Sequence, residues 1–311
     1  MSDVEQVFRR VVPDRMPETI ERPRQGNHKR TAVARYPDRP AVVVQLADDP
    51  AAVHTEATLL AAVADRTSVP VPRLLAHGRL DGRGYLVTEY VDGTDLHERF
   101  DALPADRRQQ VARQFGSVLA RLHEAFAFES AGPLSVDAGG SLIGGGRSIA
   151  EAFTTAAEDA LAALPAAFDD LRPELAAALE PPARTRRPRL FPWDLRPGNA
   201  LVSAGDLAAV LDWGGPQAAD PALSVAKTEH LVARWYGTDP EPLRSAFRGG
   251  YRSVRPLPSV PRAYRVAAVV TAAVDSAGVV TRPHYPERTG AEAVAIHRAW
   301  LTEWLDTGEG E

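Results

Sequence analysis

Three oxygen-bearing side chains lie close together in the sequence segments FPWDLRPGNALV (residues 191–202) and VLDWGG (residues 210–215). Asp194 and Asn199 are five residues apart, and Pro197-Gly198 between them favours a tight loop. Asp212 follows a short apolar run. Each of these residues alone is also typical of an Asx turn that caps a strand or loop. Only their combination therefore indicates a functional site.

A predicted β-hairpin gives these residues a common place. Apolar runs at residues 200–202 and 207–211 flank the turn sequence SAGD. Because strands joined by a tight turn lie side by side, Asn199 before one strand and Asp212 after the other should meet at one edge, near Asp194. Carboxylate and amide oxygens suit Mg²⁺, which takes its remaining ligands from phosphate and water. The pattern favours phosphoryl transfer, with one carboxylate accepting a hydroxyl proton.

The segments before residue 91 predict a small β-rich lobe that precedes this hairpin. A short helix is expected over residues 3–14, and a longer one over residues 51–65 begins after Asp49-Pro50. Extended runs at residues 30–35, 41–46, 69–75 and 85–91 are bounded by turn sequences such as DGRG at residues 81–84. We therefore expect a β-β-α-β-β lobe over residues 1–90.

The rest of the chain, residues 91–311, is predicted to be mostly helical. Apolar periodicity predicts helices over residues 105–126, 149–164, 173–179, 222–236, 242–251, 262–278 and 291–305. Asp220 followed by Pro221 is typical of a helix start, with the carboxylate as the N-cap. The two parts together predict an α+β fold with two lobes.

Composition excludes several kinds of chemistry. The 311 residues contain no cysteine, which excludes disulfides, thiolate metal sites and cysteine nucleophiles. The formal net charge of −5 argues against a nucleic-acid partner, and no apolar run approaches the length of a membrane span. The N-terminal segment lacks the apolar centre of a signal peptide, so we expect a cytoplasmic protein without a membrane partner. The oligomeric state is left open.

Further motifs extend the pattern. The chain has PWDLRPGN at residues 192–199, LDW at residues 211–213, ADP at residues 219–221, LARLH at residues 119–123 and VPVP at residues 69–72. With these motifs the chain resembles the aminoglycoside phosphotransferase and choline kinase-like family, which is related to the protein kinases. The family's signature HGDLHPGN is similar to residues 192–199, and the likeness spans roughly residues 20–300.

The resemblance implies a protein kinase-like fold, with a nucleotide-binding N-terminal β lobe and a larger helical lobe that binds substrate. It implies ATP-dependent, or alternatively GTP-dependent, phosphorylation of a hydroxyl on a small molecule, with Mg²⁺ as cofactor. Asp194 would be the catalytic base, and Asn199 and Asp212 the Mg²⁺ ligands. Glu89 and Val91 would lie in the hinge that receives the nucleotide base.

The residues expected to bind the nucleotide phosphates depart from the family pattern. Gln45 stands where the resemblance expects a strand lysine that contacts the phosphates, and Glu56 would be that lysine's ion-pair partner. A neutral amide supplies no charge, so phosphate binding should weaken. Lys29, in the turn that includes Gly26, is the first candidate to reach the phosphates from another strand, and Arg35 is the second.

The catalytic loop also departs from the family pattern, because Pro192-Trp193 replaces the family's His-Gly. We expect altered loop packing there rather than lost activity. Together with Gln45, this change leaves a second hypothesis open: a nucleotide-binding pseudokinase or regulatory module without turnover.

Overall fold

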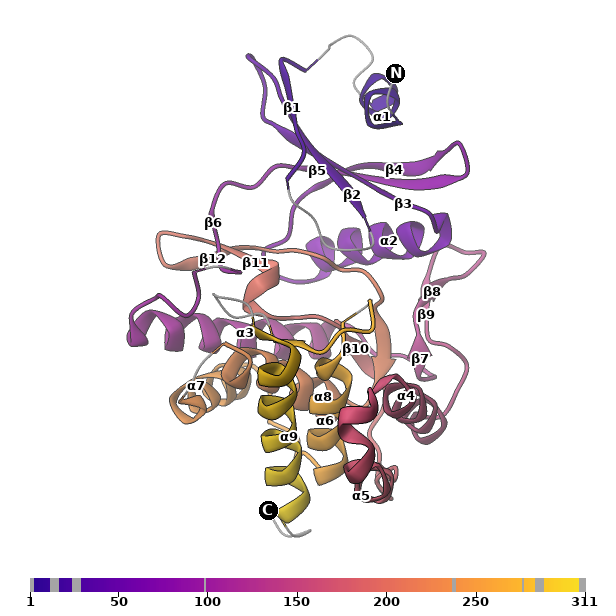
Figure 1. Cartoon of the computed structure of the whole chain (residues 1–311). Helices are drawn as coiled ribbons and strands as arrows, with labels where there is room; N and C mark the ends of the chain where they lie inside the picture. The colour runs from indigo at the N-terminus through magenta and orange to yellow at the C-terminus, as the bar shows by residue number, and fades with distance from the viewer. Residues whose placement is uncertain are drawn as a thin grey trace.

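A five-stranded antiparallel sheet forms the N-terminal part of the computed structural model, in the order β1-β2-β3-β5-β4 (Figure 1). Its strands are β1 (Thr19–Glu21), β2 (Arg30–Arg35), β3 (Val42–Ala47), β4 (Leu74–Leu80) and β5 (Arg83–Glu89). The structure describes residues 3–11, 17–23, 29–97, 99–236, 239–275, 277–282 and 288–307. The predicted antiparallel lobe is confirmed, and β1 is a strand that the sequence did not predict.

Period-two alternation assigns the two faces of the sheet. Val42, Val44 and Leu46 of β3 are buried in a cluster with α1 (Asp3–Val11). The opposite face, which includes Ala47, packs on Val53 of α2 (Pro50–Arg66). The two helices accordingly lie on opposite sides of the sheet (Figure 1). Alternate residues of β3 therefore pack against α1 on one face of the sheet and against α2 on the other.

Helices form most of the C-terminal part. They are α3 (Ala105–Ala125), α4 (Ile149–Ala163), α5 (Arg172–Ala178), α6 (Pro221–Glu229), α7 (Pro240–Arg252), α8 (Arg262–Ala273) and α9 (Gly290–Asp306). A 3₁₀ segment at Ala166–Leu171 precedes α5, and a π-helical turn at His230–Arg234 continues α6. No helix among the described residues is long and apolar enough to cross a membrane. The mixed α+β, kinase-like architecture predicted from the sequence is confirmed.

Short strands connect these helices. One three-stranded sheet has the order β10-β13-β7 (Arg189–Phe191, Gln217–Ala219 and Gly132–Pro133), and another has β12-β11-β6 (Asp206–Val210, Ala200–Ser203 and Thr94–Asp95). Two small hairpins are β8-β9 (Ser135–Val136 and Leu142–Ile143) and β14-β15 (Thr281–Arg282 and Arg288–Thr289). The β11-β12 hairpin is the one predicted from the sequence, and it lies between α2 and α3 (Figure 1).

One core cluster spans the helical part and reaches α2. It contains Leu59, Leu60 and Val63 of α2 together with residues of α3, α6, α7 and α8. The side of α2 that faces away from the sheet is therefore buried by the helical part. A division of the chain at residue 90 stays a prediction, since this core crosses it.

Helix α8 ends earlier than predicted, at Ala273 instead of residue 278. The carboxylate of Asp275 accepts hydrogen bonds from the N–H groups of Ala277 and Val279, at 2.8 and 2.9 Å. Gly278 takes a φ of +78°, and the chain turns back so that Val274 and Val280 form a bridge. The Asp side chain thus stabilises a turn that competes with the helix.

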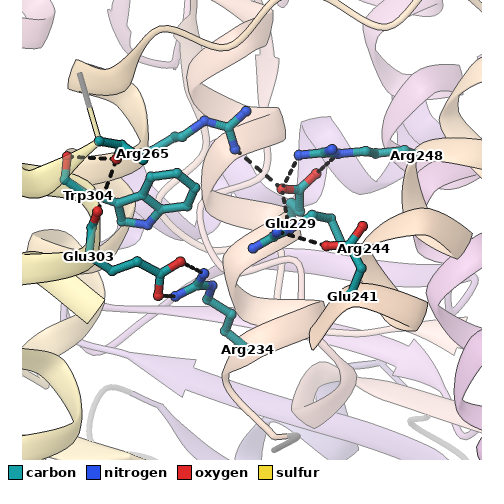
Figure 2. A network of polar contacts seen from close by, with 9 residues as sticks. Glu229, Arg234, Glu241, Arg244, Arg248, Arg265, Glu303 and Trp304 are labelled. Atoms are coloured by element: carbon teal, nitrogen blue, oxygen red, sulfur yellow. Dashed lines mark hydrogen bonds and ion pairs between the residues drawn. The ribbon is translucent and has the colours of Figure 1, made fainter. Parts of the chain in front are cut away.

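A buried carboxylate joins three of the helices. Glu229 of α6 is only 8% exposed, and its oxygens lie 2.6–3.5 Å from guanidinium nitrogens of α7 and α8, those of Arg244, Arg248 and Arg265 (Figure 2). A second ion pair, between Arg234 and Glu303, ties the π-helical turn to α9 (Figure 2). Both networks hold the helices of the C-terminal part against one another.

Helices α3 and α7 approach each other through glycines. A Cβ added at Gly116 would lie 1.9 Å from the carbonyl oxygen of Phe247, and one at Gly250 would lie 1.8 Å from that of Arg113. Main-chain atoms cannot move aside as a flexible side chain can. The two helix backbones are therefore in direct contact, and only glycine fits.

This contact predicts that Gly116→Ala destabilises the fold by about 1–3 kcal/mol or more, the usual cost of overpacking. Alanine favours a helix over glycine by only about 1 kcal/mol, so propensity does not offset the clash. Chemical denaturation gives the free energy of unfolding. The control is Gly139→Ala in an exposed turn, where the nearest atom to a new Cβ belongs to the flexible side chain of Asp137. Equal stability of Gly116→Ala and the wild type would contradict the prediction.

Candidate active site

The loop after β10 brings Asp194 and Asn199 together. The side-chain amide of Asn199 donates hydrogen bonds to the main-chain oxygen and to Oδ2 of Asp194, both at 2.9 Å. A 3₁₀ turn at Pro197–Asn199 supplies the reversal that the Pro-Gly sequence predicted. Arg196 donates from Nε to the same Oδ2, also at 2.9 Å, and from a terminal nitrogen to the hydroxyl of Tyr236 at 3.1 Å.

Cationic neighbours keep Asp194 ionised. Burial by itself would raise the pKa of Asp194, but the positive charges of Arg196 and Lys227 and the Asn199 hydrogen bond lower it below the usual value. The side chain remains 34% exposed, so its carboxylate is accessible. An accessible, ionised carboxylate in a fixed orientation can align a hydroxyl group and accept its proton.

Lys227 is a site residue that the sequence did not identify. It lies on α6 and is 4% exposed, and its Nζ is 3.4 Å from the centroid of the Trp193 ring, a cation–π contact. Burial, opposed by Asp194 and reinforced by Arg196, lowers the pKa of Lys227 to about 7. The only available signal was compositional, since Lys29 and Lys227 are the two lysines of the chain.

Asp212 projects from the end of the β11-β12 hairpin. The N–H of Leu211 donates to the carbonyl oxygen of Asn199 at 2.8 Å, which fixes the two chain segments side by side as predicted. Asp212 takes a φ of +55°, a left-handed conformation that Asp tolerates better than most residues. Its side chain is 52% exposed, so the carboxylate can meet a ligand.

Lys29 makes the ion pair that the resemblance assigned to a lysine at position 45. Its Nζ lies 2.6 Å from Oε1 of Glu56 and 2.9 Å from Oδ1 of Asp212. Burial would lower the pKa of Lys29, but the two carboxylates outweigh it and raise the pKa. Glu56 itself is 4% exposed. One ammonium group therefore joins α2 to the end of the hairpin.

Gln45 lies on β3 directly opposite Thr31 of β2. Lys29 is two residues before Thr31, so its side chain leaves the sheet on the same face as Gln45. Arg35, the second candidate, is at the other end of β2, where its Nε pairs with Glu21 at 2.8 Å. The structure thus brings Lys29, and not Arg35, to Glu56 and Asp212.

The predicted hinge residues lie at the end of β5 and just after it. Glu89 is the last residue of that strand, and its side chain pairs with Arg73. Val91 is half-buried in the connection from β5 to β6. Gly26 lies outside the described residues. The described part of the chain contains no group of three or more His, Cys, Asp or Glu side chains that could hold a metal ion.

The donor set at the hairpin nevertheless fits Mg²⁺, which needs few protein ligands. The amide nitrogen of Asn199 is engaged with Asp194, which leaves the amide oxygen as the acceptor of that side chain. The exposed carboxylate of Asp212 adds a second oxygen, and Lys29 contacts only Oδ1. Asn199 and Asp212 are therefore the residues that would hold the ion.

Comparison with solved structures supports the same fold. Aminoglycoside phosphotransferase APH(4)-Ia, a thermostable mutant in apo form, matches with a TM-score of 0.68 and 16% identity over 99% of this chain and 100% of that one. A protein of Ralstonia eutropha described as a putative aminoglycoside phosphotransferase gives 0.61 and 17% over 97% and 95%. Wild-type aminoglycoside 2'-phosphotransferase-IIIa gives 0.59 and 15% over 96% of each chain.

The sequence comparisons match a family profile but no individual curated protein. No curated protein sequence matches this chain. The profile of the phosphotransferase enzyme family matches residues 19–267, which include the sheet, the Asp194 loop and the hairpin. This chain therefore belongs to the phosphotransferase enzyme family.

Proposed function

We propose that this protein transfers a phosphoryl group from ATP, or alternatively GTP, to a hydroxyl group of a small molecule in a Mg²⁺-dependent reaction. The observation that carries the proposal is the adjacency of two fixed groups. One is the Asp194–Asn199 pair in the loop, and the other is the Asp212–Lys29–Glu56 cluster at the end of the hairpin. Phosphoryl transfer needs a hydroxyl activator on one side and charge compensation for phosphate on the other.

Asp194 would act on the acceptor. Its carboxylate would accept a hydrogen bond from the attacking hydroxyl and take the proton as the new bond to phosphorus forms. Arg196 and Asn199 hold the carboxylate in one orientation and keep it ionised. Asp194 is therefore the proposed catalytic base.

Lys29, Asn199 and Asp212 would act on the nucleotide. The ammonium group of Lys29 would compensate phosphate charge, while Glu56 holds it in place. Mg²⁺, when bound by Asn199 and Asp212, would offset the charge that develops on the transferred group. Glu89 and Val91 are proposed to place the base through their main-chain groups, and Gly26 is proposed as a further nucleotide-binding residue.

Similar proteins support these ligand classes. A mutant of APH(4)-Ia is described as a ternary complex with AMP-PNP and hygromycin B, and 2'-phosphotransferase-IIIa as a GDP complex. A nucleotide and a hydroxylated small molecule are accordingly the proposed ligands here. The proposed location is the cytoplasm, which supplies nucleoside triphosphates. The proposed lobes are residues 1–90 and 91–311.

The pseudokinase hypothesis rests on Gln45, which cannot supply the strand lysine's charge, and on Pro192-Trp193 in the catalytic loop. The placement of Lys29 weakens that hypothesis, because Glu56 has a cationic partner all the same. The two functions differ in one measurement. An enzyme consumes nucleotide steadily with Mg²⁺ and a metabolite mixture, whereas a binding module gains thermal stability from nucleotide without turnover.

We expect Asp194→Asn to lower turnover by about 100- to 10,000-fold, the range for removal of a general base. The amide keeps the shape of the carboxylate but accepts no proton. Phosphorylation of a metabolite library, read by mass spectrometry, first identifies an acceptor for the wild type, and steady-state rates then compare the variant. AMP-PNP binding by calorimetry serves as the control and should change little. Wild-type rates in the variant would show that Asp194 is not the base.

A second prediction concerns the displaced lysine. Lys29→Met should lower kcat/KM for the nucleotide by about 10- to 100-fold, the value of a charge-assisted contact. Adding Gln45→Lys should restore part of the loss, because position 45 offers an ammonium group on the same face of the sheet.

The matched control for that variant is Arg30→Met, which removes the cation next to Lys29 in the chain. Arg30 is opposite Leu46 on the other face of the sheet, so its loss should leave the nucleotide parameters unchanged. If Lys29→Met and Arg30→Met have the same effect, the role of Lys29 in nucleotide binding is wrong.

A further inference from the structure

A cavity adjoins the Asp194 loop on the side of α4, α6 and α8. Its walls are mostly small or apolar side chains, among them Phe153 of α4, Leu223 of α6 and Val270 of α8. Phe191 and Trp193, the residue before Asp194 in the chain, also line it. The cavity volume is about 30 Å³, which is room for about two water-sized groups. A short apolar group therefore fits.

The cavity contains one cation that lacks a polar partner. Lys227 is only 4% exposed, and within the described part of the chain its ammonium group has no hydrogen bond or ion pair. It contacts the face of Trp193, and it lines the cavity. Leaving an ammonium group in this state is costly, because buried charges are normally paired. An anionic group entering the cavity would supply that pair.

The other charged residue of the cavity wall is already engaged. Asp220 accepts hydrogen bonds from the main-chain N–H groups of Ala222 and Arg186, at 2.8 and 3.0 Å, as the N-cap of α6. Its carboxylate is 1% exposed, so it offers little to a ligand. The face of Trp193, which could otherwise attract a ligand cation, is covered by Lys227. The cavity thus disfavours cations.

We propose that this cavity receives the acceptor, and that the acceptor is a hydroxylated anion with a small apolar group, such as a short hydroxy acid. Its carboxylate would pair with Lys227 and its apolar group would fill the cavity. Its hydroxyl would face Asp194, which directly follows the cavity residue Trp193 in the chain. The role of this ligand as phosphoryl acceptor depends on the proposed phosphotransfer. The preference for an anion depends only on the cavity.

Compounds of matched shape and different charge test this proposal. One series is lactate, lactamide and isopropanolamine, which share a methyl group beside a secondary hydroxyl. A longer series with the same methyl group is 3-hydroxybutyrate, 3-hydroxybutyramide and 4-aminobutan-2-ol, and hygromycin B is the polycation. Binding to the full chain with AMP-PNP and Mg²⁺ is measured by calorimetry, and product formation with ATP by mass spectrometry.

We expect lactate to bind about 10-fold or more tightly than lactamide, because the amide loses the charge-assisted contact with Lys227. Isopropanolamine should be weakest, because its ammonium group brings a like charge next to Lys227. Lys227→Met should abolish the preference for the anion and lower its affinity about 10- to 100-fold. Lys29→Met, the other lysine of the chain, should keep the ranking of the three compounds.

The ranking in the wild type decides the proposal even if Lys227→Met folds poorly, which its AMP-PNP binding reports. Cation binding equal to or tighter than anion binding, or no binding by either anion, would overturn it. An unchanged ranking in a folded Lys227→Met protein would also overturn it. Anion-selective binding without product would leave this inference standing and contradict the phosphotransfer proposal. Phosphorylation of hygromycin B without any preference for the anions would contradict this inference and leave the phosphotransfer proposal standing.

Discussion

The arrangement of the site depends on one ammonium group held between two carboxylates. Lys29, which is 17% exposed, contacts Glu56 on α2 and Asp212 at the end of the β11-β12 hairpin. Helix α2 belongs to the sheet region and the hairpin to the helical region, so this contact links the two sides of the site (Figure 1). Removing the ammonium would leave a 4% exposed Glu56 without its cation, a state that costs several kcal/mol in buried pairs. The ion pair therefore fixes the position of Asp212 as well.

Sheet register explains how a lysine on one strand can replace a lysine on the next. Gln45 and Thr31 are directly opposite in the β2-β3 pair, and side chains two residues apart on an extended chain share a face. Lys29 thus emerges on the same side as Gln45, toward α2. Its four-carbon side chain spans the remaining distance to Glu56. The ammonium group therefore reaches Glu56 from the segment just before β2, and not from β3.

Local sequence rules predicted much of the fold and the core of the site. The Pro-Gly turn, the SAGD hairpin and the Asp220-Pro221 helix start all act over a few residues, and each is found as predicted. Lys227 was not predicted, because its nearness to Asp194, far away in the sequence, arises from the packing of α6 on the loop. The end of α8 was also missed, since the Asp275 turn competes with apolar periodicity that continues past it.

In the proposed reaction, different residues would bind the acceptor and the phosphates. Asn199, Asp212 and Lys29 come from a loop, a hairpin and the segment just before β2, and they are proposed to act on the nucleotide. The proposed acceptor cavity is lined by α4, α6 and α8, where Lys227 interacts electrostatically with Arg196. A polycation would meet repulsion from both groups, although the similar solved structures include proteins named for aminoglycosides. Membership of the family therefore fixes the reaction class, while the charge of the acceptor has to be argued from this chain's own cavity.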